Sequence, residues 1–261
     1  MKQTLQNRFP RRWLLLAFVL NFAIAVAALL PYMIRDGGLL LVAADFDAEQ
    51  LSYNMLCNNA IKSGEVLWNW RIDIGSDFVS SFSFYTLGSP FFWLSLLVPS
   101  RWMPWMMVPL LCLKMALAGG GAYLWARRWV RSEDGSLLAG VLYAFSGFTV
   151  YNIFFNHFLD VVALFPYMLA SLDDAVLDGK RGAFPFWVAL NLVNNYFFFA
   201  GQAVFLILYF LCMLAGRAYK VGPRSFAALA GETLLGCAMG CVLLIPVSYT
   251  HLRAHETRHD L

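Results

Sequence analysis

Residues 35–50 read RDGGLLLVAADFDAEQ and directly follow the first long apolar segment of the chain. Within this stretch, Asp45, Asp47 and Glu49 place three acids within five residues. The whole chain is 60% hydrophobic and only 13% charged, so a group of acids beside an apolar segment marks a boundary between two solvents. We therefore expect this stretch to follow a membrane span and to open a polar region that carries chemistry.

The composition places the chain in a membrane. Its mean hydropathy is +0.62, and its 261 residues include 23 Phe and 9 Trp, which is more than one soluble core of this size requires. We predict an all-α fold, a polytopic transmembrane helical bundle. The formal net charge of +3 includes no dense basic run, which argues against nucleic acid as a partner. The five cysteines lack the spacing of a disulfide framework or a zinc site.

The first apolar segment sets the predicted topology. Residues 13–33 are long enough to cross about 30 Å of hydrocarbon as a helix. The basic residues within residues 1–12 place that N-terminal segment in the cytoplasm. The apolar run is too long for a signal-peptide core and lacks a cleavage site, which favours a retained anchor. Residues 35–103 then form a long external loop.

Two segments inside this loop are expected to lie at the membrane surface. Residues 48–63 have the mixed polar and apolar character of an interfacial helix, which Gly64 ends. Residues 89–99 have a short apolar core between Pro90 and Pro99, which is short for a span and fits an interfacial or re-entrant segment.

The rest of the chain supplies further apolar segments, at residues 104–126, 136–153, 159–175, 184–200, 201–216 and 226–246. If residues 89–99 do not cross, the basic clusters after these segments all fall on the side of the N-terminus. These clusters are Arg127, Arg128 and Arg131, then Lys180 and Arg181, then Arg217, Lys220 and Arg224. Amides at Asn194 and Asn195 predict a break between two helices near the external surface.

The same topology brings residues 156–160, NHFLD, to the external side, where they could meet the acids of the first loop. Asp160 and His157 are therefore a candidate functional pair. The alternative for Asp160 is an acid near a helix start, favoured by the helix dipole, and His157 could be an ordinary interfacial residue.

Asp45, Asp47 and Lys114 have two interpretations each. The two acids are either a solvated loop start or a site in which one carboxylate activates a hydroxyl group or holds a divalent cation. Lys114 lies near the middle of a predicted span, where a lone charge costs about 2.5–3.5 kcal/mol. Its partner would be an acid from another helix or the phosphate of a lipid-linked molecule.

The last residues differ in character from the rest. Residues 255–259 spell HETRH, a zinc-protease pattern, but they have no third ligand and no flanking helix core. We reject the zinc interpretation, because residues 247–261 resemble translated sequencing-adaptor read-through. We expect residues 247–261 to be a non-native tail, residues 13–246 to be a partial transmembrane domain, and the natural protein to continue beyond it.

Several motifs recur together in the order of a known family. They are DFDAEQ at 45–50, WNWRIDIG at 68–75, SFYTLGSPFFW at 83–93, the Leu113–Lys114 step, FNHFLD at 155–160, Phe165 with Pro166, and NYFFF at 195–199. From residue 13 to about residue 246, the chain resembles the bacterial YfhO family.

The resemblance implies a GT-C-like glycosyltransferase in the bacterial cytoplasmic membrane, acting on its outer face. Its partners would be membrane lipid, a polyprenyl-phosphate-linked sugar as donor, and an envelope polymer such as lipoteichoic acid, or a glycolipid, as acceptor. The resemblance implies that Asp45 and Asp160 are the catalytic carboxylates, and that they would hold Mg or Mn if the enzyme depends on a metal. In the family pattern Asn is common at the position of Asp47 and Gln at that of Glu49, so Asp45 and Gln50 are the positions that the resemblance supports most directly.

Two function classes follow. In an inverting sugar transferase, Asp45 acts as base or metal ligand, Asp160 supports it, and Lys114 neutralises the departing phosphate, while Gln50, His157 and Asp47 contact substrate. A lipid or polymer transporter would instead place ionisable groups on both sides and at mid-depth. The enzyme predicts acids gathered at the outer surface, and apart from Lys114 the sequence favours it. A structural scaffold without chemistry is the weaker third possibility.

Overall fold

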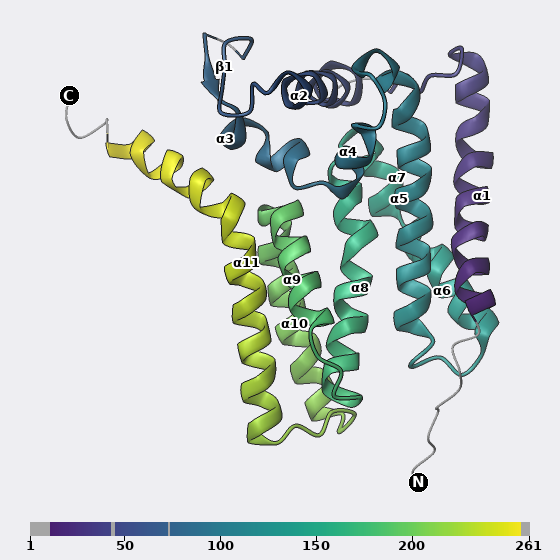
Figure 1. The fold of residues 1–261 in the computed structure, drawn as a ribbon. Helices are drawn as coiled ribbons and strands as arrows, with labels where there is room; N and C mark the ends of the chain where they lie inside the picture. The colour runs from purple at the N-terminus through teal and green to yellow at the C-terminus, as the bar shows by residue number, and fades with distance from the viewer. Residues whose placement is uncertain (1–10, 43–44, 73, 257–261) are drawn as a thin grey trace.

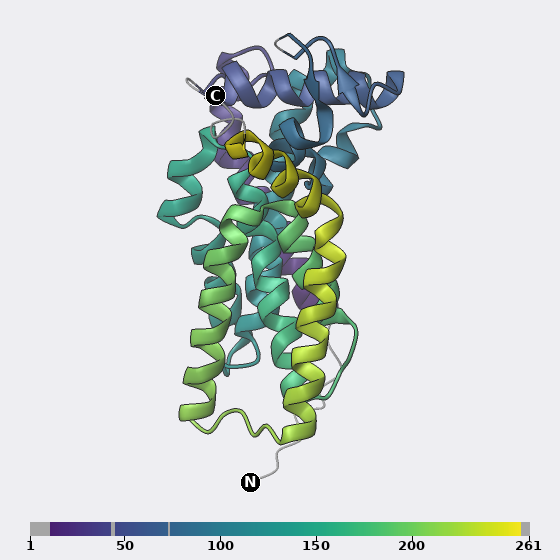
Figure 2. The same cartoon turned by 90° about the vertical axis from the view of Figure 1, so that its left-hand side faces the viewer.

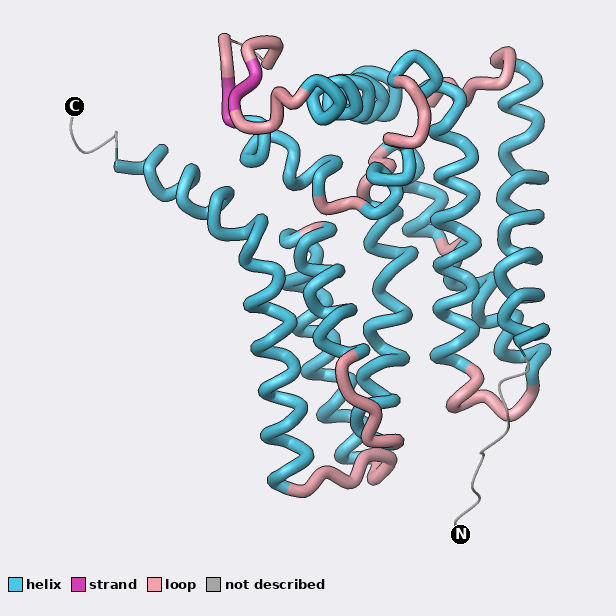
Figure 3. Tube along the Cα trace, in the orientation of Figure 1, coloured by secondary structure: helices cyan, strands magenta, loops and turns pink. Residues whose placement is uncertain are grey.

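The computed structural model describes residues 11–42, 45–72 and 74–256, with side chains as far as Tyr249. The chain forms a bundle of long helices, one end of which is covered by short elements (Figure 1). The strands among the described residues are β1 (Trp68–Asn69) and β2 (Ser76–Asp77), a two-residue antiparallel pair (Figure 3). The predicted all-α polytopic fold is confirmed.

The bundle is made of helices that run along its long axis. They are α1 (Arg11–Arg35), α5 (Met103–Ala126), α6 (Glu133–Ala144), α8 (Phe158–Leu177), α9 (Ala183–Asn194), α10 (Tyr196–Ala215) and α11 (Pro223–Glu256). Among the described residues, five helical segments are long and apolar enough to cross a membrane: Arg11–Arg35, Ser100–Ala126, Glu133–Phe154, Tyr196–Ala215 and Pro223–Tyr249.

A layer of short elements lies over one end of the bundle. It contains η1 (Phe46–Gln50), α2 (Leu51–Ser63), β1, β2, α3 (Phe78–Phe82), η2 (Ser83–Leu87), α4 (Pro90–Ser95) and η3 (Ser100–Trp102). We call residues 36–102 the loop layer, the end of the bundle beneath it the loop end, and the opposite end the base end. Figure 2, turned by 90°, shows the loop layer over the same end of the bundle.

The helices alternate in direction as the charge pattern predicts. The start of α1 and the connections 127–132, 178–182 and 216–222 lie at the base end (Figure 1). The segment between α6 and α8, which contains α7 (Gly147–Tyr151) and η4 (Asn152–Phe154), lies at the loop end with the junction of α9 and α10. The predicted basic clusters therefore share one end, and the acid-bearing segments share the other.

Helix α5 is the centre of the bundle and packs against α1, α6 and α8. Its glycines allow this close approach, as the sequence GGG at 119–121 suggests. A Cβ added to Gly119 would lie 2.2 Å from the side chain of Asn21 on α1, and one added to Gly121 would lie 2.7 Å from the ring of Tyr167 on α8. By contrast, Gln202 is the only buried residue of α10, so the surface of this helix is available to lipid.

Both segments expected at the membrane surface form helices in the loop layer. Helix α2 ends at Gly64, whose φ of 81° is the left-handed conformation that glycine adopts most readily. The expected helix start at residue 48 is replaced by the π-helical turn η1, and α2 begins at Leu51. Residues 89–99 form only the short helix α4, whose start is stabilised by Ser89 accepting a hydrogen bond from the Phe92 N–H. This segment does not cross the bundle.

The expected segment 136–153 lies within Glu133–Phe154, which is long and apolar enough to cross a membrane and is divided into α6, α7 and η4. One predicted boundary was wrong. The expected boundary between residues 200 and 201 lies instead at Asn195, where the amides of the sequence had predicted the break. Asn195 is extended, with φ −158°, and its side chain accepts a hydrogen bond from the Phe198 N–H and so starts α10.

Helix α11 continues past the expected domain end at residue 246. It contains Pro246 and extends to Glu256, and its last part bends away from the bundle (Figure 1), as a proline inside a helix favours. Residues 257–261 of the expected tail, and with them part of HETRH, lie outside the described residues. The non-native origin of residues 247–261 stays a prediction.

Candidate functional site

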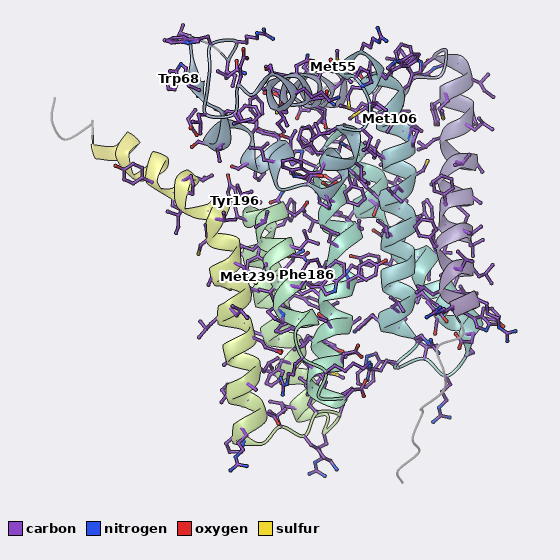
Figure 4. The ribbon with its side chains drawn as sticks, viewed as in Figure 1. Met55, Trp68, Met106, Phe186, Tyr196 and Met239 are labelled. Carbon is purple, nitrogen blue, oxygen red and sulfur yellow. The ribbon has the colours of Figure 1, made fainter. Side chains whose placement is uncertain are left out.

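The polar residues at the loop end come from the loop layer, α5 and the start of α8. Figure 4 shows Tyr196, the first residue of α10, just below the loop layer, and Met55 and Met106 where α2 lies over α5. Met55 and Met106 belong to the apolar cluster that joins the loop layer to the bundle. The polar site described below therefore lies next to a well-packed apolar junction.

Lys114 on α5 and Asp160 on α8 form a buried ion pair. Lys114 Nζ lies 2.5 Å from Asp160 Oδ1, and the two side chains are only 3% and 2% exposed. Lys114 also donates hydrogen bonds to the carbonyl oxygen and the side-chain oxygen of Asn156, at 2.9 and 2.8 Å. These contacts use all three donors of the ammonium group, so the partner of Lys114 is an acid from another helix.

Ser89 completes the surroundings of Asp160. Its hydroxyl group donates to Asp160 Oδ2 while its oxygen accepts the hydrogen bond that starts α4. Asp160 also lies in the first turn of α8, where the helix dipole favours a negative charge. Sequence reasoning missed Ser89 and Asn156. The serine before Pro90 is a helix-start signal, but no local pattern indicates that it reaches α8.

A small polar void lies beside the ion pair. It has a volume of about 10 Å³, and its lining includes Ser89, Lys114, Asn156, His157 and Asp160. A void of this size is near the minimum that holds one water molecule. The Phe91 ring lies 5.3 Å from Lys114 Nζ and covers another side of the cation. The pair is therefore held in place, with little free space around it.

A larger cavity lies next to this void. Its volume is about 120 Å³, and it is lined by Asp45, Glu49, Gln50, Phe84, Tyr85, Phe155, His157 and Phe158. Tyr85 and His157 line both spaces. The structure thus brings the first acidic segment and the NHFLD segment together, but Asp45 and Asp160 line different spaces, with Tyr85 and His157 at the border.

Gln50 and His157 are linked across the two segments. The Nδ1 atom of His157 lies 3.0 Å from the side-chain oxygen of Gln50, and both residues are buried. Burial, and then repulsion from Lys114, lowers the pKa of His157 to about 3, so the imidazole is neutral at physiological pH. Gln50 Nε2 and His157 Nε2 have no hydrogen-bond partner.

The cavity has a negative electrostatic character. Burial raises the pKa of the Tyr85 hydroxyl group, and the nearby charges of Glu49 and Asp45 raise it further. Tyr85 therefore stays protonated and can donate a hydrogen bond. Asp47 does not line the cavity. Its Oδ1 lies 3.4 Å from the backbone N–H of Val42, a long contact within the loop layer.

The donor set does not fit a cation shared by Asp45 and Asp160. The oxygens of Asp160 contact Lys114 and Ser89, whereas Asp45 lines the other space. Over the described ranges, no group of three or more His, Cys, Asp or Glu side chains could hold a metal ion. Asp45 and Glu49 line the same cavity. A divalent cation bound there would have these two carboxylates as its protein ligands.

A second buried carboxylate lies further along α8, toward the base end. Asp173 accepts hydrogen bonds from Trp129 Nε1 at 3.0 Å, from the Tyr209 hydroxyl group at 2.9 Å, and from the Tyr219 hydroxyl group. Both of its oxygens are therefore occupied, and its side chain joins α8 to α10 and to two base-end connections.

The fold and the site define a helical membrane protein with a polar cavity at the loop end, bounded by two segments far apart in the sequence. The chain belongs to the family described as bacterial membrane protein YfhO, whose family model matches residues 17–260. This confirms the resemblance seen in the motifs, and the protein is embedded in a membrane. No curated protein and no solved structure matches the chain.

Proposed function

We propose that this protein is a membrane glycosyltransferase that uses a polyprenyl-phosphate-linked sugar as donor and a cell-envelope molecule, such as lipoteichoic acid or a glycolipid, as acceptor. The observation that carries the proposal is the 120 Å³ cavity, where two carboxylates, a Gln–His pair and aromatic rings meet beside a buried ion pair. Membership in the family described as bacterial membrane protein YfhO suggests a glycosyltransferase-like role and so supports the proposal. The active face would be the loop end, on the outer side of the cytoplasmic membrane.

Asp45 acts as the general base in this proposal. The acceptor hydroxyl oxygen forms a bond to the anomeric carbon of the donor, its proton passes to the Asp45 carboxylate, and the carbon–oxygen bond to the phosphate breaks. The bonding electron pair leaves with the polyprenyl phosphate, and because the hydroxyl group attacks from the face opposite the phosphate, the configuration at the anomeric carbon inverts. Mg or Mn, if required, would add charge stabilisation near Asp45 and Glu49, and no step above depends on it.

Lys114 and Asp160 act as positioning residues. Their ion pair and the hydrogen bonds from Lys114 to Asn156 fix the segment that carries His157. The three donors of Lys114 are already used, so a contact with the departing phosphate requires Lys114 to exchange one Asn156 contact. In that exchange the ammonium group would stabilise developing negative charge.

The test compares Asp45→Asn with Asp134→Asn, which changes an exposed acid at the start of α6 at the base end. Each variant is assayed for sugar transfer from a polyprenyl-phosphate donor in reconstituted membranes. Asp45→Asn should reduce transfer by about 10²–10⁴-fold, while Asp134→Asn should retain it. Undiminished transfer by the Asp45 variant would defeat the proposal.

One observation favours the transporter alternative. Buried carboxylates occur toward both ends of α8, Asp160 and Asp173, as a path through the bundle requires. The alternative predicts that liposomes containing the protein move a fluorescent lipid-linked sugar between leaflets without any acceptor. Protection of the fluorophore from an external quencher shows that the lipid-linked sugar has moved to the inner leaflet. Sugar transfer gives different products, namely the freed lipid and a glycosylated acceptor.

A further inference from the structure

We infer that Gln50 and His157 form a recognition pair for neighbouring hydroxyl groups of an uncharged, single-ring ligand in the 120 Å³ cavity, that is, one sugar residue. The inference deepens the proposed function and rests on it, because it names the part of the substrate that the cavity holds. It also assigns a specificity role to two residues that neither donate nor accept the transferred group.

The first argument is the state of the polar atoms. Gln50 is 1% exposed and His157 is 5% exposed, yet Gln50 Nε2 and His157 Nε2 have no hydrogen-bond partner. Buried polar side chains in folded proteins nearly always have a partner, either protein, water or ligand. Both residues line the cavity, and although the two atoms are themselves enclosed, a rotation of either side chain would turn its unpaired atom toward a cavity occupant.

The second argument is the chemistry that the pair can offer. With the side-chain oxygen of Gln50 facing Nδ1 of His157, Nδ1 carries the proton, Nε2 is an acceptor, and the amide nitrogen is a donor. If the amide is turned around, its nitrogen donates to Nδ1, and Nε2 becomes the donor while the amide oxygen becomes the acceptor. In both arrangements the pair presents one donor and one acceptor.

This combination selects among ligand classes. A hydroxyl group both donates and accepts, so a pair of neighbouring hydroxyl groups satisfies both atoms. A phosphate offers acceptors and would leave the acceptor of the pair unsatisfied, while the negative charges of Asp45 and Glu49 would repel it. A quaternary ammonium group offers no hydrogen bond to either atom. The pair therefore matches an uncharged polyol better than an anion or a cation.

The third argument is the size and the walls of the cavity. Its volume of about 120 Å³ is on the same scale as the roughly 150 Å³ of a cavity that holds benzene, so its size matches a single ring and not a longer chain of sugars. The rings of Phe84 and Tyr85 each lie 5.1 Å from the His157 ring, and Phe155 and Phe158 form further walls. These rings supply apolar surfaces for the C–H faces of a sugar.

The experiment observes His157 directly. The chain has four histidines, and the other three are in the tail, at residues 251, 255 and 259. With these three changed to Gln, His157 is the only histidine in the full chain, and ¹⁵N-histidine labelling in lipid nanodiscs reports its two ring nitrogens. The probes are the methyl glycosides of glucose, galactose and N-acetylglucosamine, their single-deoxy analogues, inorganic phosphate and tetramethylammonium.

We expect at least one methyl glycoside to shift the Nε2 signal, with an affinity that falls about 10-fold or more when one particular hydroxyl group is removed. Phosphate and tetramethylammonium should leave the signal unchanged. Gln50→Glu keeps an acceptor for Nδ1–H but removes the amide donor, so it should preserve the Nδ1–H tautomer and weaken glycoside binding to the level of the deoxy analogue.

The inference is overturned if no glycoside of the panel shifts the signal, if phosphate or tetramethylammonium shifts it instead, or if Gln50→Glu binds glycosides as the unchanged chain does. Failure of the proposed function gives a different result. In that case the glycoside shift and its dependence on Gln50 are present, but no transfer occurs in the reconstituted assay.

Discussion

Asp160 and Asp173 are two buried carboxylates on the same helix, α8, and their surroundings differ. Asp173 accepts hydrogen bonds from two tyrosines and one tryptophan, so both of its oxygens have neutral donors. Asp160 is paired with the cation of Lys114 and lies beside a polar void. Two residues that share one cavity near this pair, Gln50 and His157, retain polar atoms without a partner.

The comparison separates two uses of buried charge. At the base end, both Asp173 oxygens accept hydrogen bonds from Trp129 and the two tyrosines. A cluster in which these groups all have protein partners is typical of a structural connection. At the loop end, the ion pair fixes the segment that carries His157. His157 and Gln50, which line the cavity, each have a hydrogen-bonding atom without a protein partner. A fully satisfied cluster has nothing to offer a ligand, whereas a partly satisfied one does.

The largest expected effect comes from breaking the ion pair on one side. Lys114→Met should destabilise the protein by about 3–5 kcal/mol, because it leaves the Asp160 carboxylate buried without its cation. Reversible unfolding in mixed micelles measures the change. The double variant Lys114→Met/Asp160→Leu should recover most of that loss, since no charge then remains buried. A double variant as unstable as the single one would contradict the assignment of the cost to an unpaired charge.

A smaller effect is expected at the base end. Asp173→Asn should cost about 1–3 kcal/mol, because the amide nitrogen replaces an acceptor and leaves at least one donor, such as the Tyr219 hydroxyl group, without a partner. Sugar binding in the cavity should not change, since the cluster lies toward the other end of α8. The measurements are the unfolding free energy and the affinity for the methyl glycosides. A loss of affinity without a loss of stability would show that Asp173 belongs to the site.

The smallest effect is a dependence of stability on pH at the loop end. The pKa of His157 is lowered to about 3 in the folded protein, compared with about 6.5 in an unfolded chain. Below pH 6.5 the unfolded state therefore binds a proton that the folded state does not, and stability falls as the pH falls. Between pH 6.5 and 5.5 the loss should be about 1 kcal/mol.

The control for this prediction is His157→Gln, which removes the titrating group. The difference in unfolding free energy between the two proteins should change with pH over that interval, while contributions from the carboxylates and from the tail histidines cancel. A difference that is independent of pH would mean that His157 titrates normally in the folded protein. The Asp173 cluster involves no histidine, so Asp173→Asn should leave the pH dependence intact.

The sequence predicted those features that depend on local patterns. The hydropathy of the chain predicted the helical bundle, the positions of the basic clusters predicted which segments share an end, and the amides at Asn194 and Asn195 predicted the break before α10. Gly64 predicted the end of α2. In each case the relevant physics, such as lipid solvation or a helix terminus, acts within a few neighbouring residues.

The features that the sequence did not predict depend on contacts across the fold. The partner of Lys114 stayed open between an acid and a phosphate, because the sequence alone does not say which face of α5 meets α8. The hydrogen bond from Ser89 to Asp160 joins residues 71 positions apart. The separation of Asp45 and Asp160 into different spaces depends on the packing of Tyr85 and His157, which no local pattern encodes.

The buried ion pair also has a consequence for the biogenesis of the protein. Lys114 is made before Asp160, so α5 enters the bilayer at a time when its cation has no partner there, at a cost of about 2.5–3.5 kcal/mol on insertion scales. The arrival of α8 removes this cost. Insertion of α5 should therefore be completed only together with α8, and a nascent chain that stops before residue 160 should leave α5 exposed to the insertion machinery or to quality-control proteases.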